Sequence, residues 1–390
     1  MGSESAQIAN AGASWRTTRR GFASASGAGV ISVLMQGCSN KRTSGVEFPL
    51  TIPLSLGSIG SFAFPCSAGE AKWFRAQMVP RAENLNQGQC LHMLYLHGSD
   101  AEFEDCRFSS SAELLRVFLD TDVSEKLFGQ PCFVKSRFGV RVPGDAKSSA
   151  ADEAHRDQTL AVLGHLGVSS GTKITLANSE KATVRDAIDD SIATFDLGTA
   201  ELEWIAWAYA MYLPPNRRWT NRFGDCFTFD MLVGALRSKS LPSASCGGAH
   251  VLFSLTMILR ADGHSAILTD ASRRSLEEFL VFARDEAIGN QHDDGSWSLS
   301  WHRKLVPKTV ESMVYDSSSG RLIATGHIAE WLLYLPEELQ PPEEVYRKAA
   351  LWLASELRRV ELKQSELFCP FTHALFVVNR GSESALRQGP

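Results

Sequence analysis

After His155, apolar residues recur every three to four positions, a period that predicts a series of amphipathic helices. In the clearest of them, residues 272–288, one stripe consists of Leu276, Phe279, Leu280, Ala283 and Ala287. We expect helices near 155–166, 183–195, 199–213, 227–237, 247–261, 272–288, 321–335, 342–358 and 369–379. Residues 155–380 are therefore predicted to be one helical domain.

The pattern before His155 is different and predicts a small mixed section over residues 46–145. Residues 111–119 fit a short helix, and residues 134–142 alternate as a strand with a basic outer face. Residues 89–96 are a short apolar run, and the stretch of small residues from 143 to 154 is the best candidate for a linker.

Composition narrows the class of protein. The chain has 390 residues, a net charge of −5 and 44% hydrophobic residues, which is typical of a globular protein. The acidic balance argues against a nucleic-acid-binding partner, which would require a basic footprint. No apolar run approaches the ~20 residues that span a bilayer, so contact with a membrane is expected only through a lipid anchor.

The stretch from Gln291 to Trp301 follows the long helix and is expected to turn sharply. Gly295 permits a left-handed backbone, Asp294 can accept hydrogen bonds from nearby amides, and Trp297 is large enough to anchor the turn against neighbouring helices.

Gln291-x-x-Asp294-Gly295-x-Trp297 resembles the Gln–Trp motif of squalene and other terpenoid cyclases. The β-subunits of protein prenyltransferases share that fold, an α/α toroid in which inner and outer helices alternate around a central cavity. The resemblance implies a mostly α protein, with residues 155–380 forming an α/α toroid that is possibly an incomplete ring. Together with the stretches 245–250 and 325–331, the motif also resembles an uncharacterised family of exported planctomycete-type bacterial proteins, which implies no activity.

Two groups of residues could carry chemistry. His327 and Glu330 are three positions apart on one predicted helix, so they can form an acid–base pair, or simply a structural one. His250 and His373 each follow a cysteine by four positions, at Cys246 and Cys369. These two pairs could converge on zinc, but the sequence favours helix-start histidines and buried thiols, and we predict no metal.

The acids Asp186, Asp189 and Asp190 do not have the spacing of the acid motif of squalene cyclases. They fall opposite the apolar stripe of their helix, and we expect them to be a solvated face.

Residues 1–45 resemble an export segment. Arg19-Arg20 is a twin-arginine pair followed by a short apolar run, and Leu34 to Cys38 resembles a lipoprotein cleavage box with Cys38 as the lipidated residue. We expect a periplasmic or cell-envelope protein, possibly lipid-anchored.

The leading hypothesis is an exported protein whose central cavity binds an apolar or sugar-like small molecule. Lyase or transferase chemistry would use His250, His327, Glu330 and His373. The alternatives are a catalytically inert envelope scaffold and a zinc-dependent, prenyltransferase-like enzyme. The sequence decides neither whether the protein is an enzyme nor its cofactor or oligomeric state.

Export predicts a processed amino terminus. Mass spectrometry of protein purified from membranes should find a mature chain that begins at a lipid-modified Cys38, because the preceding residues are removed as a signal. A Cys38→Ser variant should be released from the membrane fraction, and an intact Met1 in the wild type would contradict the prediction.

Overall fold

The computed structural model describes residues 86–103, 107–143, 157–241, 244–302, 318–359 and 368–387, together with residues 69, 70, 73 and 76. The predicted export segment, including Cys38, and residues 144–154 of the predicted linker lie outside the described residues. The described part is mostly helical, as the amphipathic pattern indicates.

Most helices begin and end close to the predicted positions, but α13 continues to Arg387, eight residues beyond its predicted end at 379. Two others, α2 and α4, lie in the front section where no helix was predicted. The helices are α2 (Gln87–His97), α3 (Ser111–Phe118), α4 (Thr121–Phe128), α5 (Gln158–His165), α6 (Val184–Ala193), α7 (Leu202–Tyr212), α8 (Phe229–Ser238), α9 (Ala249–Ser265), α10 (Asp270–Gly289), α11 (Ser318–Tyr334), α12 (Glu343–Arg359) and α13 (Phe368–Arg387).

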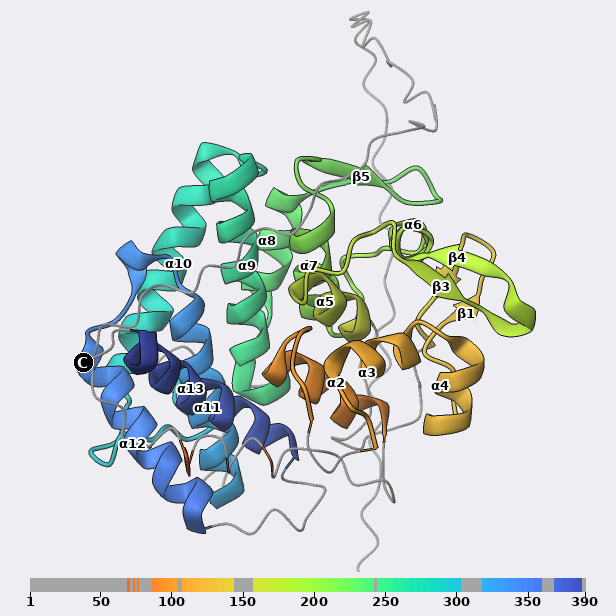
Figure 1. The fold of residues 1–390 in the computed structure, drawn as a ribbon. Coiled ribbons are helices and arrows are strands. Elements are labelled where there is room, and N and C mark those ends of the chain that lie inside the picture. The colour runs from red at the N-terminus through yellow and green to blue at the C-terminus, as the bar shows by residue number, and fades with distance from the viewer. Residues whose placement is uncertain are drawn as a thin grey trace, which may run out of the picture. The chain divides into compact units, whose positions relative to one another are not determined.

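Six helices form a closed cycle of contacts. In order along the cycle, α2 packs against α5, α5 against α7, α7 against α9, α9 against α11, α11 against α13, and α13 back against α2. Most of the remaining helices pack against members of this set; α10 lies against α9, and α12 lies against both α11 and α13 (Figure 1). The exception is α4, which packs against α3. The front section therefore supplies one helix, α2, to the same cycle as the later helices.

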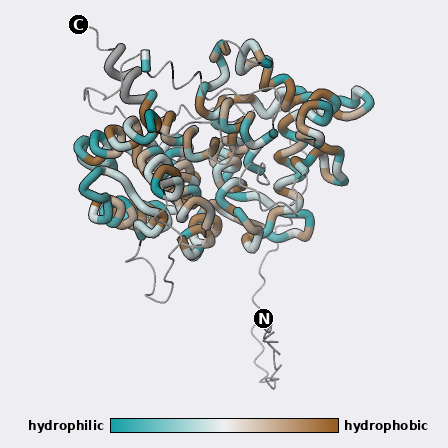
Figure 2. Tube along the Cα trace, turned by 90° about the horizontal axis from the view of Figure 1, so that it is seen from below, coloured by the Kyte–Doolittle hydropathy of each residue, from teal (hydrophilic) through white to brown (hydrophobic). Residues whose placement is uncertain are grey.

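Burial distinguishes the two sets of helices. All eleven residues of α7 are buried, whereas only four of the twenty residues of α10 are. A helix that packs on every side is apolar all round, and a helix on the outside of a bundle needs only one apolar stripe. Figure 2 colours the chain by hydropathy and shows apolar and polar residues interspersed along it. No helix among the described residues has the length and apolar character to cross a bilayer.

Three short hairpins connect helices in the described part of the chain. Strands β3 (Lys173–Thr175) and β4 (Lys181–Thr183) pair antiparallel. Strands β5 (Arg218–Thr220) and β6 (Cys226–Thr228) form a second hairpin.

The prediction of a single strand over residues 134–142 is wrong. The segment folds back on itself as β1 (Val134–Lys135) and β2 (Val140–Arg141), which pair antiparallel. The turn is closed by a hydrogen bond from the Ser136 amide to the Gly139 carbonyl. The alternation of apolar and basic residues is the same in one long strand and in two short ones, so it could not reveal the turn.

The prediction that Asp186, Asp189 and Asp190 share a solvated face is also wrong for one of them. Asp190 is buried and accepts a hydrogen bond from the Ser136 hydroxyl of the β1–β2 hairpin. Asp186 caps the start of its helix together with Thr183, and Asp189 pairs with Arg185. The hairpin covers this side of α6, which the pattern within the helix could not indicate.

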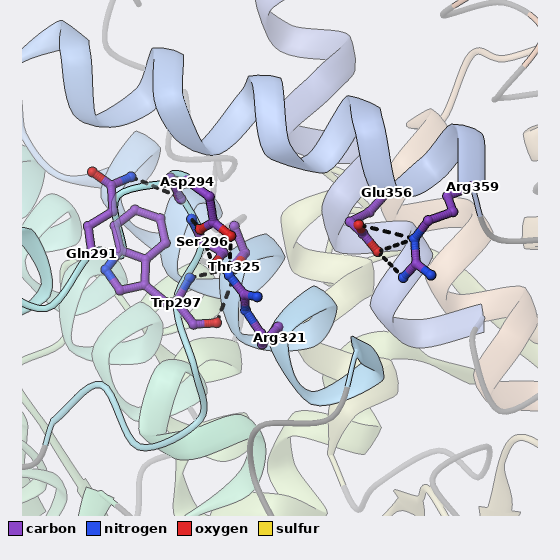
Figure 3. Close-up of polar contacts among 9 residues, drawn as sticks. Gln291, Asp294, Ser296, Trp297, Arg321, Thr325, Glu356 and Arg359 are labelled. Atoms are coloured by element: carbon purple, nitrogen blue, oxygen red, sulfur yellow. Dashed lines mark hydrogen bonds and ion pairs between the residues drawn. The ribbon is translucent and has the colours of Figure 1, made fainter.

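The turn after α10 has the predicted anchors. The indole of Trp297 is fully buried, and its Nε1 donates to the Ala287 carbonyl at 2.7 Å. Its backbone amide donates to the Thr325 hydroxyl at 2.9 Å, which joins the turn to α11. Gln291 reaches the Val345 carbonyl on α12, and Asp294 accepts from Ser296 within the turn (Figure 3). The turn therefore fastens α10, α11 and α12 together.

Gly295 is the position of this turn that should tolerate substitution least. Its φ is +94°, and a Cβ there would lie 2.3 Å from the Lys348 carbonyl oxygen. We expect Gly295→Ala to lower the free energy of unfolding by roughly 2–4 kcal/mol through backbone strain and the clash with α12. Urea unfolding measures the change.

Gly234→Ala is the matched control. Gly234 lies inside α8, and a Cβ there would meet no atom within 4 Å. Alanine should stabilise that helix by roughly 0.5–1 kcal/mol. Equal effects of the two substitutions would show that the turn does not have the tight contact described here.

Candidate functional site

A buried carboxylate lies where α2, α11 and α13 meet. Glu330 on α11 is 2% exposed. Its Oε2 lies 2.7 Å from Nδ1 of His373 on α13, and its Oε1 accepts a hydrogen bond from the Tyr95 hydroxyl on α2. His327, one helical turn before Glu330, has its Nδ1 3.7 Å from the same Oε2. Glu330 therefore holds partners from three helices.

The imidazoles of the site lie against one another. The ring centroids of His327 and His373 are 3.6 Å apart, and those of His250 and His327 are 4.7 Å apart. His250 also contacts Trp204, at a centroid distance of 4.6 Å. These side chains come from the starts of α9 and α13 and from the middle of α11.

Gly326 explains why the rings of His327 and His373 are so close. A Cβ at this position would lie 2.9 Å from the backbone nitrogen of Ala374 and 3.1 Å from the carbonyl carbon of His373. Glycine thus lets the backbone of α11 touch that of α13.

Two cysteines complete the cluster. Cys246 and Cys369 are partly buried free thiols, and their sulfurs interact with each other. The Cys369 sulfur also interacts with His327 and His373. A hydrogen bond from Trp301 Nε1 to the Gly247 carbonyl, at 3.2 Å, fixes the segment that carries Cys246.

Electrostatic interactions favour the charged forms of Glu330 and His373. Burial alone would raise the pKa of Glu330, but the charge of His373 and hydrogen bonds from both histidines outweigh it and hold that pKa well below its usual value. Burial alone would lower the pKa of His373, yet the charge of Glu330 and the neighbouring Cys369 raise it to about 10. The pair is therefore an imidazolium and a carboxylate at neutral pH.

The pKa values of the two cysteines shift in opposite directions. The pKa of the Cys369 thiol is held well below its usual value, first by its hydrogen bond with Cys246 and then, against the effect of burial, by the nearby histidines. The pKa of Cys246 is raised by the same bond and by burial. The hydrogen bond between the two sulfurs thus favours ionisation of Cys369 over that of Cys246.

This cluster forms the polar end of a pocket of about 500 Å³, measured with its opening. Aromatic side chains make up much of the rest: Trp204 stacks on Trp207 at 5.7 Å, and Trp207 meets Phe253 edge to face at 4.6 Å. Among the described residues that line the pocket, none is Lys or Arg.

Three overlapping groups of side chains have the donor atoms and spacing to hold a metal ion. The ligand atoms within each group lie within 4.8 Å of one another. The groups are Cys246, His250 and His327; His92, Cys369 and His373; and His327, Glu330 and His373.

The structure brings together all four predicted catalytic residues, His250, His327, Glu330 and His373, at one pocket. Sequence reasoning missed Tyr95 and His92, which lie on α2 in what looked like a short apolar run. It found the two Cys-x-x-x-His pairs and placed both histidines at one cavity, but favoured satisfied histidines and buried thiols over a shared metal. Comparison with known protein families, curated proteins and solved structures finds no significant match to this chain.

Removing the hydroxyl of Tyr95 tests whether the buried Glu330 carboxylate is charged. Tyr95→Phe takes a hydrogen bond away from a carboxylate and should lower the free energy of unfolding by about 1.5–3 kcal/mol. Tyr346→Phe removes an equally buried hydroxyl that donates to the neutral Leu332 carbonyl at 2.8 Å, and should cost only about 0.5–1.5 kcal/mol. Thermal and urea unfolding of both variants give the comparison; a cost at Tyr346 equal to or above that at Tyr95 would argue that Glu330 is uncharged.

Proposed function

We propose that the chain is an exported enzyme of α/α-toroid architecture that binds an apolar or sugar-like small molecule in its aromatic pocket and acts on it at the polar end. The observation that carries this proposal is the convergence of His250, His327, Glu330 and His373 from three separate helices on one pocket. In a scaffold, histidines at such distant positions would have no reason to meet beside an opening.

The toroid is supported by the closed cycle of α2, α5, α7, α9, α11 and α13. In an α/α toroid the inner helices contact their neighbours all the way around, and outer helices cover them. The full burial of α7 and the one-sided burial of α10 fit inner and outer positions. The Gln–Trp motif then serves as the turn that joins an outer helix, α10, to an inner one, α11.

The pocket lining favours a ligand that is uncharged. Indole and phenyl faces suit an isoprenoid chain or the apolar face of a sugar. A diphosphate would enter a pocket in which His373 is already paired with the Glu330 carboxylate and no described lining residue is Lys or Arg, so its negative charge would be uncompensated. This argues against the prenyltransferase-like alternative, whose donor is a prenyl diphosphate.

The polar end provides one histidine suited to exchanging a proton with a ligand. His250 lines the pocket and is less buried than His327 and His373. Its ring lies between Trp204 and His327, which fix its position. We assign His250 the acid–base role in lyase or transferase chemistry, and Glu330 with His373 the role of holding the polar end in place.

Ligand class can be tested with farnesol and farnesyl diphosphate as probes. Trp204 and Trp207 line the pocket, so an occupant should change the fluorescence of the protein. We expect farnesol to bind at least tenfold more tightly than its diphosphate because the pocket cannot neutralise the phosphate charge. Methyl glucoside is the parallel probe for a sugar-like ligand.

Two variants locate the binding. Trp207→Phe should reduce the fluorescence response, whereas Trp352→Phe should retain it, since Trp352 lies on α12 under Arg321 and outside the pocket lining. The absence of any response to farnesol and to methyl glucoside would favour the inert-scaffold alternative. Tighter binding of the diphosphate would favour the prenyltransferase-like one.

A further inference from the structure

We propose that the polar end of the pocket is a zinc site, in which Zn²⁺ is bound by the sulfurs of Cys246 and Cys369 and by the Nε2 atoms of His327 and His373. Two of these ligands, His327 and His373, line the pocket, so the site borders it and rests on the proposed function. The test of the zinc site measures the metal content of the protein, whereas the test of the proposed function measures binding of a small molecule. Either proposal can therefore fail while the other stands.

The four side chains come from three segments that the fold brings together. Cys246 lies just before α9, His327 is in the middle of α11, and Cys369 and His373 are in the first turns of α13. Cys246 and His327 have ligand atoms within 4.8 Å of each other, as do Cys369 and His373, and the two imidazoles stack at 3.6 Å. The Cys369 sulfur also interacts with the Cys246 sulfur and with both imidazoles, so the four donors are neighbours at the junction of these segments.

Glu330 leaves the correct nitrogen of each imidazole available. Its carboxylate faces Nδ1 of His373 at 2.7 Å and Nδ1 of His327 at 3.7 Å. The opposite nitrogens, Nε2 of both rings, are buried and have no hydrogen-bond partner of regular geometry in the described part of the chain, and the Cys369 sulfur is the group that interacts with both rings. A carboxylate on one ring nitrogen and a metal on the other is the arrangement by which proteins orient histidine ligands.

The donor set selects the ion. Two sulfurs and two imidazole nitrogens in a tetrahedral arrangement favour Zn²⁺, whereas Mg²⁺ and Ca²⁺ require oxygen ligands. Binding would release the proton of the Cys246 thiol and the Nε2 proton of His373, and the ion would supply the positive charge that two partly buried thiolates need. His250 and His92 border the four ligands: His250 contacts His327, and His92 contacts His373 at 5.6 Å. Because His250 is not one of the proposed zinc ligands, it keeps the acid–base role toward a small molecule bound in the pocket.

The experiment measures metal in the full-length protein. Elemental analysis of the wild type, purified without chelator, should give about one zinc per chain. Cys246→Ser and Cys369→Ser should each lose most of it, because each removes a ligand. Cys226→Ser is the matched control, since Cys226 is exposed on β6, and it should keep its zinc.

A second measurement covers variants that fail to fold. Wild-type protein stripped with EDTA and loaded with Co²⁺ should develop thiolate-to-cobalt charge-transfer absorption. Glu330→Gln should bind zinc about 10–100-fold more weakly, as expected for loss of the carboxylate behind a histidine ligand. Glu344→Gln, at a surface ion pair with Arg347, should leave zinc affinity unchanged.

Three results would overturn the zinc site. They are no zinc after reconstitution with added Zn²⁺, a cobalt spectrum without thiolate bands, and a mass of the unreduced protein that places a disulfide between Cys246 and Cys369. Zinc binding without any response to farnesol or methyl glucoside would instead retain the metal site and remove the proposed ligand class.

Discussion

A carboxylate buried at the junction of three helices is the feature on which the centre of this protein depends. Removing an ionised group from water is costly unless charges and hydrogen bonds replace the lost hydration. Glu330 obtains those replacements from Tyr95 on α2 and His373 on α13, so the requirement of one side chain connects the first and last helices of the cycle to α11. The orientation of the imidazoles follows from the same contacts.

Much of the fold could be predicted from the sequence because amphipathic helices carry their pattern locally. The helices α10 and α12 have a single apolar stripe, and their bounds agree closely with the prediction. The helix α2 was missed for the opposite reason: eight of its eleven residues are buried, so it shows no stripe. The closure of the cycle by α2 depends on contacts between segments far apart in the chain, which no local period encodes.

The candidate site could likewise be predicted only where its residues are close to one another in the sequence. His327 and Glu330 are neighbours on one helix, and each Cys-x-x-x-His pair is visible as a short spacing. Which pairs meet is decided by helix packing, so the sequence could not choose between separate histidines and a shared centre. Tyr95 is 235 residues from its acceptor Glu330, and nothing near either residue indicates the other. The burial of Asp190 was missed similarly, because a hairpin from elsewhere covers it.

The contact at Gly326 has a consequence for how such a centre can change over time. The spacing between His327 and His373 is set by two backbones in contact, at a residue that has no side chain. A methyl group there would separate the two rings while leaving every chemically reactive residue in place. In a related sequence, replacement of this glycine would therefore mark an altered centre even where the histidines, cysteines and carboxylate are all still present.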